Sequence, residues 1–349
     1  MEINIENRKI GKDQPVFIVA DLSANHLRNY DLTIKTIKAI KESGADAVKF
    51  QTYTPDTLTI DSEEEFFQIK HGTLWDGCNL YKLYKDIYMP LEWQPKLKKI
   101  AEDLGLICFS TPTDKSTVDF LEEMNVPVYK ISSFEITDIP FIEYVASKKK
   151  PVIISTGIAT LSDIEKAISS CKKWGNHSIA LLKCSSSYPT PLEEINLKTI
   201  PDMERRFNTI VGLSDHTFSI SSSLGAVALG AKIIEKHFIL DKNLNSPDAA
   251  FSLNPEEFTF LVKSIRELEK ELGEISYELT ERLKLNKTSF SRSLFIVKDM
   301  KKGEVFTHEN IKSIRPGYGL SPEFINEIIG KKSKRELYKG QPLTWDMIE

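Results

Sequence analysis

The sequence lacks several features that define common functional classes. It has no run of about 18 apolar residues, so we expect no membrane-spanning helix. The net charge is −4 and charges of both signs are mixed, which argues against nucleic-acid binding or a polybasic membrane patch. No glycine-rich phosphate loop of the dinucleotide or Walker type follows an apolar run, which argues against nucleotide binding.

Cysteine is also scarce. The four cysteines show no paired spacing, and two of them, Cys108 and Cys184, lie in apolar runs. We therefore expect buried thiols in a reducing compartment rather than disulfides. The chain begins Met-Glu-Ile-Asn-Ile-Glu, without the basic and then apolar stretch of a signal peptide, so we expect a cytoplasmic protein.

What the sequence does contain is a regular alternation of short apolar runs with amphipathic segments. Its 349 residues suggest one large and one small domain. Helix signals separate the runs, such as the capping box of Thr160 and Asp163 and the Asn254-Pro255 start of a helix that Gly273 can end. Eight strands with helices between them predict an α/β fold, a (β/α)8 TIM barrel over residues 1–273. The predicted strands are 17–20, 45–50, 106–109, 126–131, 151–154, 179–184, 209–213 and 232–234.

Residues 52–90 are too long for an ordinary loop between a strand and a helix, and they are rich in aromatic side chains. They follow the second predicted strand, at the catalytic face of the predicted barrel. We interpret them as a partial lid or a dimer contact. A surface insertion without a role is the alternative.

The residues after the predicted barrel suggest a linker and a small domain. Residues 274–290 are mostly polar and predict a linker, whereas 291–349 predict a β-rich domain. Within it, Lys302–Thr307 echoes Lys339–Thr344, and each copy suggests a turn followed by a strand. A domain of about 60 residues barely supports its own core, so we expect it to dock on its own barrel or on a partner's.

Two histidines follow the last two apolar runs of the predicted barrel. His216 comes after the seventh predicted strand and His237 after the eighth. Because the carboxyl ends of parallel strands meet at the catalytic face of a barrel, we expect both imidazoles there. Two neutral imidazoles can hold a divalent metal and leave its other positions open to water or substrate. For either histidine alone, the alternative is a buried core residue.

Other polar residues lie at the ends of the same strands. Lys49 and Lys130 lie in apolar runs, where a lysine is costly unless it meets an anion, so we expect both to point into the barrel mouth rather than outward between helices. With nearby hydroxyls they would bind a small phosphorylated or carboxylated molecule, beside a metal that polarises a carbonyl. Asp21, Glu135 and Glu235 are candidate acid–base groups. These residues alone leave open carbon–carbon bond formation, hydrolysis at a carbonyl, and a Schiff-base aldolase that uses Lys130.

Several of these residues belong to longer motifs, through which the sequence resembles the sialic acid synthase family. The motifs follow one another along nearly the whole chain, and the tail resembles the antifreeze-like (SAF) domain of these enzymes. They are FIVADLSANH (17–26), DAVKFQTY (46–53), YKISS (129–133), STG (155–157), GLSDHT (212–217), EKHF (235–238) and SIRPGYG (313–319).

The resemblance implies condensation of phosphoenolpyruvate with an acetamido sugar. It implies that His216 and His237 bind Mn²⁺ or Mg²⁺, which holds the aldehyde oxygen of the sugar. On this basis we predict Asp21, Glu235 and Lys130 as catalytic residues. The predicted substrate-binding residues are Lys49, Gln51, Thr111, Lys130, Ser133, Ser155, Ser186, Tyr188, Ser214, Asp248 and Arg315.

Within the family, three loops resemble the branch whose acceptor is a 2,4-diacetamido-2,4,6-trideoxy-altrose sugar. They are LSANH (22–26), TYTPDTLT (52–59) and LWDG (74–77). Two positions depart from the family pattern, because Asp21 stands where Glu is usual and Ser186 lies near a frequent Asn. The alternatives are members that make N-acetylneuraminate or legionaminate from other acetamido sugars, and an inactive barrel with a binding tail.

The resemblance also gives Arg315 a role. In the family, this arginine reaches from the small domain of one subunit into the barrel mouth of its partner. A guanidinium fork suits the carbonyl of an acetamido group. We therefore expect a domain-swapped homodimer. An exposed turn residue before Pro316-Gly317 is the alternative.

Overall fold

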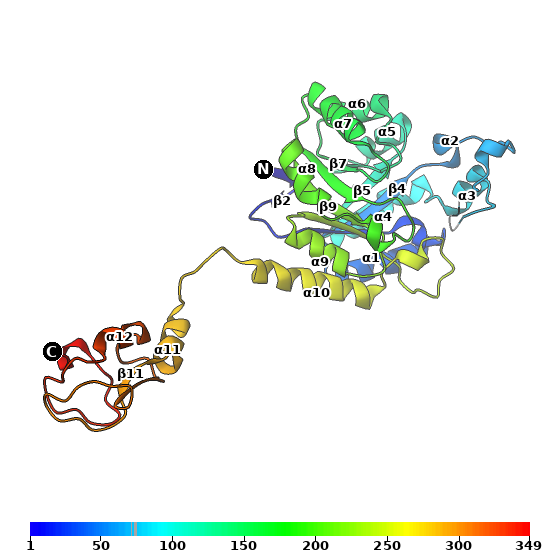
Figure 1. Cartoon of the computed structure of the whole chain (residues 1–349). Coiled ribbons are helices and arrows are strands. Elements are labelled where there is room, and N and C mark those ends of the chain that lie inside the picture. Colours follow the sequence, from blue (N-terminus) through cyan, green and yellow to red (C-terminus); the bar gives the residue numbers. More distant parts are fainter. Residues whose placement is uncertain (71, 73–74) are drawn as a thin grey trace. The chain divides into compact units, whose positions relative to one another are not determined.

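Eight parallel strands close into a barrel, in which β10 is hydrogen-bonded to both β9 and β3. The computed structural model describes every residue except 71, 73 and 74 and divides the chain into two units, Met1–Gly273 and Glu274–Glu349 (Figure 1). The barrel confirms the predicted (β/α)8 fold. Its strands are β3 (Phe17–Asp21), β4 (Ala47–Thr52), β5 (Ile107–Pro112), β6 (Tyr129–Ile131), β7 (Val152–Ser155), β8 (Ile179–Cys184), β9 (Ile210–Asp215) and β10 (Ile233–His237).

A helix follows each strand and covers the outside of the barrel. The predicted capping box of Thr160 and Asp163 begins α7, and Asn254 caps α10, with Pro255 in its first turn and Gly273 at its end. Apolar side chains of the helices and the outward faces of the strands form the large core between the two layers. The helices are α1 (Tyr30–Glu42), α4 (Gln94–Asp103), α5 (Lys115–Glu123), α6 (Ile139–Ser147), α7 (Leu161–Lys173), α8 (Thr199–Phe207), α9 (Ser221–Ala228) and α10 (Pro255–Leu272).

An N-terminal hairpin closes the amino-terminal end of the barrel. Strands β1 (Glu2–Ile5) and β2 (Arg8–Gly11) pair antiparallel. Ile3, Ile5 and Ile10 pack with barrel residues such as Phe17 and Ile233 in a second apolar core. The sequence analysis did not predict this hairpin.

The insertion after β4 carries two short helices, α2 (Pro55–Leu58) and α3 (Leu80–Ile87), which project from the side of the barrel (Figure 1). Leu74 of the LWDG loop lies outside the described residues. The next residue, Trp75, packs against Tyr188, with ring centroids 5.9 Å apart. Phe66 is 89% exposed. The insertion therefore contacts a predicted substrate-binding residue, which is compatible with a lid, and leaves apolar surface uncovered in the single chain.

The second unit has its own small core around the antiparallel strands β11 (Ser293–Ile296) and β12 (Ile311–Ile314). Its remaining helical segments are α11 (Glu281–Phe290), α12 (Ile325–Ile328) and two 3-10 turns, Pro322–Phe324 and Trp345–Met347. Helix α11 occupies much of the predicted linker 274–290, and Thr288 O accepts a hydrogen bond from Gly317 N. Part of that stretch is thus a structured element of the unit. In each copy of the repeat, a glycine of positive φ, Gly303 or Gly340, is followed by a single β-bridge residue rather than a full strand.

Among the described residues, no helix combines the length and the apolar character needed to cross a bilayer.

His26, on the 3-10 turn after β3, should make stability depend on pH. Burial and the nearby Arg28 charge lower its pKa to about 4, against 6.5 ordinarily. Between these values the unfolded chain binds a proton that the folded chain excludes, so the unfolding free energy falls as the pH decreases. From pH 7.5 to pH 5 we expect His26 to contribute a loss of about 2 kcal/mol. Urea unfolding of the native chain and of His26→Gln, each at pH 7.5 and pH 5, measures this contribution. The other groups titrate alike in the two chains, so the difference between their losses in unfolding free energy belongs to His26. Equal losses in the two chains would contradict the prediction.

Candidate active site

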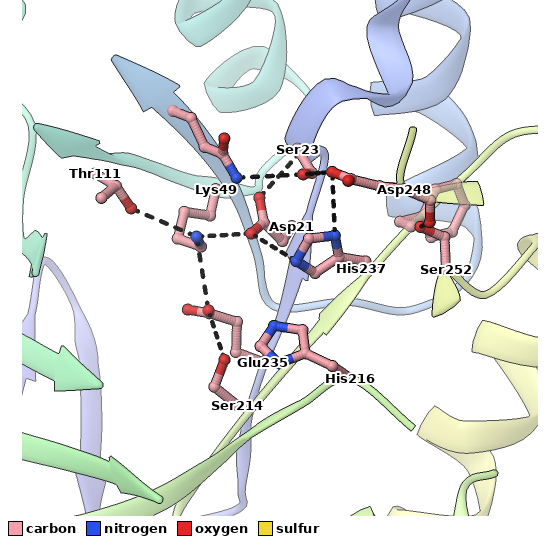
Figure 2. A network of polar contacts seen from close by, with 12 residues as sticks. Asp21, Ser23, Lys49, Thr111, Ser214, His216, Glu235, His237, Asp248 and Ser252 are labelled. Atoms are coloured by element: carbon pink, nitrogen blue, oxygen red, sulfur yellow. Dashed lines mark hydrogen bonds and ion pairs between the residues drawn. The ribbon is translucent and has the colours of Figure 1, made fainter. Parts of the chain in front are cut away.

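The register of the barrel places Asp21 beside two other predicted residues. Asp21 ends β3 and lies opposite Lys49 on β4 and His237 on β10. Lys49 Nζ is 2.7 Å from Asp21 Oδ2, and His237 Nε2 is 3.4 Å from the same oxygen (Figure 2). The carboxylate at position 21 therefore reaches both groups, although its stem is one methylene shorter than that of the usual Glu.

Glu235 is the acceptor at the centre of the cluster. Its Oε1 lies 3.0 Å from Lys130 Nζ and 3.6 Å from Lys49 Nζ, and it accepts a 3.1 Å hydrogen bond from Ser214 Oγ. Lys130 lies on β6, across the barrel from β10, so its stem crosses the interior. Both lysines point inward, yet each already faces a carboxylate. An anionic substrate would therefore have to share or replace these carboxylate contacts.

The two predicted metal ligands lie next to each other. The imidazole rings of His216 and His237 have centroids 5.1 Å apart, and Figure 2 shows them on one side of the charged cluster. His216 Nδ1 is 3.3 Å from the carbonyl oxygen of Ser185, which leaves Nε2 available. His237 Nδ1 is buried without a hydrogen-bond partner among the described residues. A buried, unsatisfied ring nitrogen beside a second imidazole fits a metal ligand.

The protein alone supplies few further ligands. Within the part of the chain that the structure describes, no three or more His, Cys, Asp or Glu side chains group so as to hold a metal ion. The nearest carboxylate to the unpaired His237 Nδ1 among the recorded ion pairs is Asp248, whose Oδ2 is 3.7 Å away. A metal held by the two imidazoles would thus complete its coordination with water or substrate, which suits a catalytic rather than a structural site.

Burial and mutual charge set the protonation of the cluster. Burial disfavours the charged form of Lys49, but Asp21 and Glu235 outweigh it and raise its pKa. Burial lowers the pKa of Lys130, because Glu235 offsets only part of the desolvation. Burial likewise opposes ionisation of Glu235, but Lys130 and Lys49 hold its pKa below the usual value. Asp21 and Glu235 thus face the two lysines directly, and their mutual attraction offsets part of the cost of burial.

The two imidazoles differ in protonation. Burial, reinforced by the charges of His216 and Lys49, lowers the pKa of His237 well below 6.5. His237 is therefore neutral at pH 7, which is the form that binds metals. Burial also disfavours the imidazolium of His216, but the negative charge of a Cys184 thiolate, with hydrogen bonds to Cys184 and to the Ser185 carbonyl, outweighs burial and raises the pKa of His216.

The other predicted residues of the barrel lie at the same carboxyl ends. Lys49 Nζ donates to Thr111 Oγ1 at 3.4 Å, and Gly157 N donates to Ser133 Oγ at 3.0 Å. The Oγ of Ser155 is buried without a partner among the described residues. Ser186 and Tyr188 lie on the segment after β8, where the Tyr188 ring packs on His216 with centroids 4.5 Å apart. The barrel fold thus brings the predicted residues of the first unit to one face.

Two further predicted residues take no part in the contacts described above. Glu135, in the loop after β6, accepts a hydrogen bond from Ser132, and burial raises its pKa. Arg315 lies in the second unit, where it directly follows β12 and is exposed. Its predicted role in a partner's barrel stays a prediction.

The sequence analysis missed three contributors. Ser23 accepts from Gln51 Nε2 at 3.2 Å and donates to Asp248, and so joins two predicted residues. Cys184 Sγ lies 3.7 Å from His216 Nδ1. Phe251 packs on His237, with ring centroids 4.9 Å apart. The position of Ser23 two residues after Asp21 was a usable signal, whereas nothing in the local sequence links Phe251 to a histidine.

Comparison with known proteins agrees with this arrangement. A model of the NeuB family matches residues 36–277, which is most of the chain, and a model of the SAF domain matches residues 291–349. The chain belongs to the NeuB family. A curated relative in this family, named pseudaminic acid synthase, from Campylobacter jejuni, is 46% identical over 331 residues, covering 95% of this chain and 96% of the relative. A protein of the same name from Helicobacter pylori is 45% identical over 336 residues, covering 96% and 98%.

Two solved structures share the fold. The spore coat polysaccharide biosynthesis protein SpsE of Bacillus subtilis matches with a TM-score of 0.69 and 33% identity, over 100% of this chain and 99% of that chain. The N-acetylneuraminic acid synthetase of Leptospira borgpetersenii, solved with citrate, matches with a TM-score of 0.73 and 31% identity, over 82% and 95%. The likeness to SpsE therefore spans both the barrel and the SAF domain.

Proposed function

We propose that this protein condenses phosphoenolpyruvate with 2,4-diacetamido-2,4,6-trideoxy-β-L-altropyranose to give pseudaminic acid and phosphate. The observation that carries the proposal is the pair of adjacent imidazoles, His216 and His237, beside the two inward-pointing lysines at the carboxyl ends of the strands. Relatives named pseudaminic acid synthase at 45–46% identity support the choice of reaction.

His216 and His237 would hold Mn²⁺ or Mg²⁺. The ion, when bound, would supply Lewis-acid polarisation of the sugar's aldehyde oxygen. The fit rests on three features: the Nδ1 of His237, which has no hydrogen-bond partner in the part of the chain that the structure describes, the neutral state of that ring, and the available Nε2 of His216.

The other residues bind and orient the reactants. Lys49 and Lys130 would hold the phosphate and carboxylate of phosphoenolpyruvate, with Ser133, Ser155 and Ser214 adding hydrogen bonds. Carbon 3 of phosphoenolpyruvate would then attack the aldehyde carbon. Water adds at carbon 2, and cleavage of the carbon–oxygen bond releases phosphate.

The carboxylates complete the site. Glu235 and Asp21 would carry the acid–base steps: one would accept the proton of the attacking water, and a proton would return to the new alkoxide. Each carboxylate contacts a lysine of the cluster. Asp248, held by Ser23 and by Ala24 N, lies beside His237 and would contact the sugar.

A swapped homodimer would complete the site with Arg315 of the other subunit. The loops after β6, β7, β8 and β9 expose large apolar side chains, with Phe134 57%, Ile158 48%, Leu192 61% and Phe218 65% exposed. These loops surround the carboxyl face of the barrel, and apolar surface there suits cover by a second copy of the chain. The exposed position of Arg315 suits a residue that reaches another subunit.

A phosphate-release assay tests the substrate assignment. With phosphoenolpyruvate, Mn²⁺ and each of three acceptors, the altrose sugar, its legionaminate counterpart and N-acetylmannosamine, we expect the altrose sugar to give the highest kcat/KM. The difference should be at least about tenfold, because a polar site discriminates strongly between differently placed hydroxyl and acetamido groups. Treatment with a chelator should abolish release, and Mn²⁺ should restore it. Release that does not depend on metal would contradict the metal assignment, and a preference for another sugar would reassign the branch.

A further inference from the structure

A buried ion pair lies directly behind the two histidines. Asp215 and Lys236 occupy paired positions on β9 and β10, and each immediately precedes one of the imidazoles, His216 or His237. Because side chains alternate along a strand, this pair faces the outer helices while the histidines face the barrel interior. Lys236 Nζ is 3.0 Å from Asp215 Oδ2, and the two side chains are 0% and 1% exposed.

The pair fixes the backbone of Thr217, the residue directly after His216. Lys236 Nζ donates to Thr217 O at 2.7 Å, and Thr217 N donates to Asp215 Oδ1 at 2.9 Å. Ser223 Oγ, on helix α9, donates to Asp215 Oδ2 at 2.7 Å. The bend that carries His216 is thereby tied to β10, one residue before His237, and to the helix behind it.

Stability alone is a poor reason for these charges. Replacing a buried ion pair with well-packed apolar residues is often neutral or stabilising, since removing both charges from water is costly. The outward-facing positions two residues earlier, Leu213 and Ile234, are apolar and belong to the core between barrel and helices. The strands change from apolar to charged outward residues at the level of the two imidazoles.

We propose that the Asp215–Lys236 pair is a positioning device that sets the separation and orientation of His216 and His237 for metal binding. The inference rests on the metal role given to these histidines in the proposed function. It adds that the register of the two imidazoles is held from outside the barrel by residues that touch neither metal nor substrate. Outer-shell partners of metal ligands commonly alter affinity by about 10- to 100-fold.

The test separates metal binding from phosphoenolpyruvate binding. The double variant Asp215→Asn/Lys236→Met removes both charges together, so neither is left buried and unpaired. By calorimetry we expect its Mn²⁺ affinity to fall about 10- to 100-fold, while phosphoenolpyruvate affinity, measured with chelator present, stays within about twofold. The matched control is Asp46→Asn/Arg266→Met. This removes a 2.9 Å ion pair that lies before β4, at the other end of the barrel, and should change neither affinity.

Each outcome decides the inference. Unchanged Mn²⁺ affinity in the double variant would overturn it, as would a parallel loss of both affinities, which would indicate a distorted barrel. If the native chain binds no Mn²⁺, the metal assignment of the proposed function is wrong and the inference falls with it. If the native chain binds Mn²⁺ and the double variant binds it equally well, only the inference is wrong. If the double variant does not fold, Ser223→Ala removes one hydrogen bond of the pair, and we expect Mn²⁺ affinity about threefold lower with phosphoenolpyruvate affinity kept. No change in that variant would overturn the inference.

Discussion

His237→Ala should abolish turnover while the barrel still folds. The variant removes one of the two imidazoles, and with it the buried Nδ1 that has no hydrogen-bond partner among the residues described, so metal affinity should fall at least about 100-fold. Phosphate release should fall by about 1000-fold or more, because attack on an unpolarised aldehyde is slow. The cost in stability should be about 1–3 kcal/mol, as for most buried truncations. His216→Ala should behave alike. Circular dichroism, Mn²⁺ calorimetry and phosphate release measure the three effects.

His177→Ala is the matched control, because His177 is exposed in the loop before β8. It should keep both metal affinity and turnover. Turnover retained in either His216→Ala or His237→Ala would refute the metal assignment. If both lose activity with unchanged Mn²⁺ affinity, the imidazoles serve the reaction in another way.

Mixing Arg315→Ala with His237→Ala should restore activity that neither variant has alone. If Arg315 acts on the barrel of the partner, a mixed dimer has one site with an intact histidine pair and an intact arginine. The other site lacks both. With random exchange of subunits, roughly a quarter of the native activity should return, as expected for a two-fold dimer. The measurement is phosphate release after the two proteins are mixed and incubated.

The control mixture replaces Arg315→Ala with Arg335→Ala. Arg335 is exposed in the same unit and pairs with Asp346 at 3.1 Å. The Arg335→Ala variant alone should therefore have near-native activity. No gain above the average of the separate proteins in the Arg315 mixture would place the arginine in its own subunit's site or outside catalysis. Gel filtration of each variant should show a dimer, and a monomer would rule out the exchange mechanism.

The fold could be predicted because the barrel repeats one signal eight times. Each buried parallel strand is an apolar run, and caps such as Thr160 and Asn254 mark the helices between. The strand ends were less exact. Asp21 and His237 belong to their strands, although the apolar pattern stops before them. Polar residues at these positions face the site. A prediction from hydropathy therefore makes the strands too short at their carboxyl ends, where the candidate site lies.

Other features depend on contacts that a sequence does not display. The pairing of Lys130 with Glu235 spans 105 positions and follows from closure of the barrel rather than from local pattern. The N-terminal hairpin did leave a signal in the alternation of Ile3 and Ile5 with polar residues, which a search for longer apolar runs passes over. Part of 274–290 forms α11 despite its polar composition: Thr280 caps its start, and near its end Thr288 O accepts a hydrogen bond from Gly317 N.

The isoleucines of the β1–β2 hairpin seal the far end of the barrel with an apolar plug. Neither a charged phosphate nor a sugar can cross such a plug cheaply. Reactants and products must therefore enter and leave by the same face of the barrel, the rim formed by the loops after the strands. A cover over that rim would control both substrate binding and product release, and its opening would then limit the turnover rate.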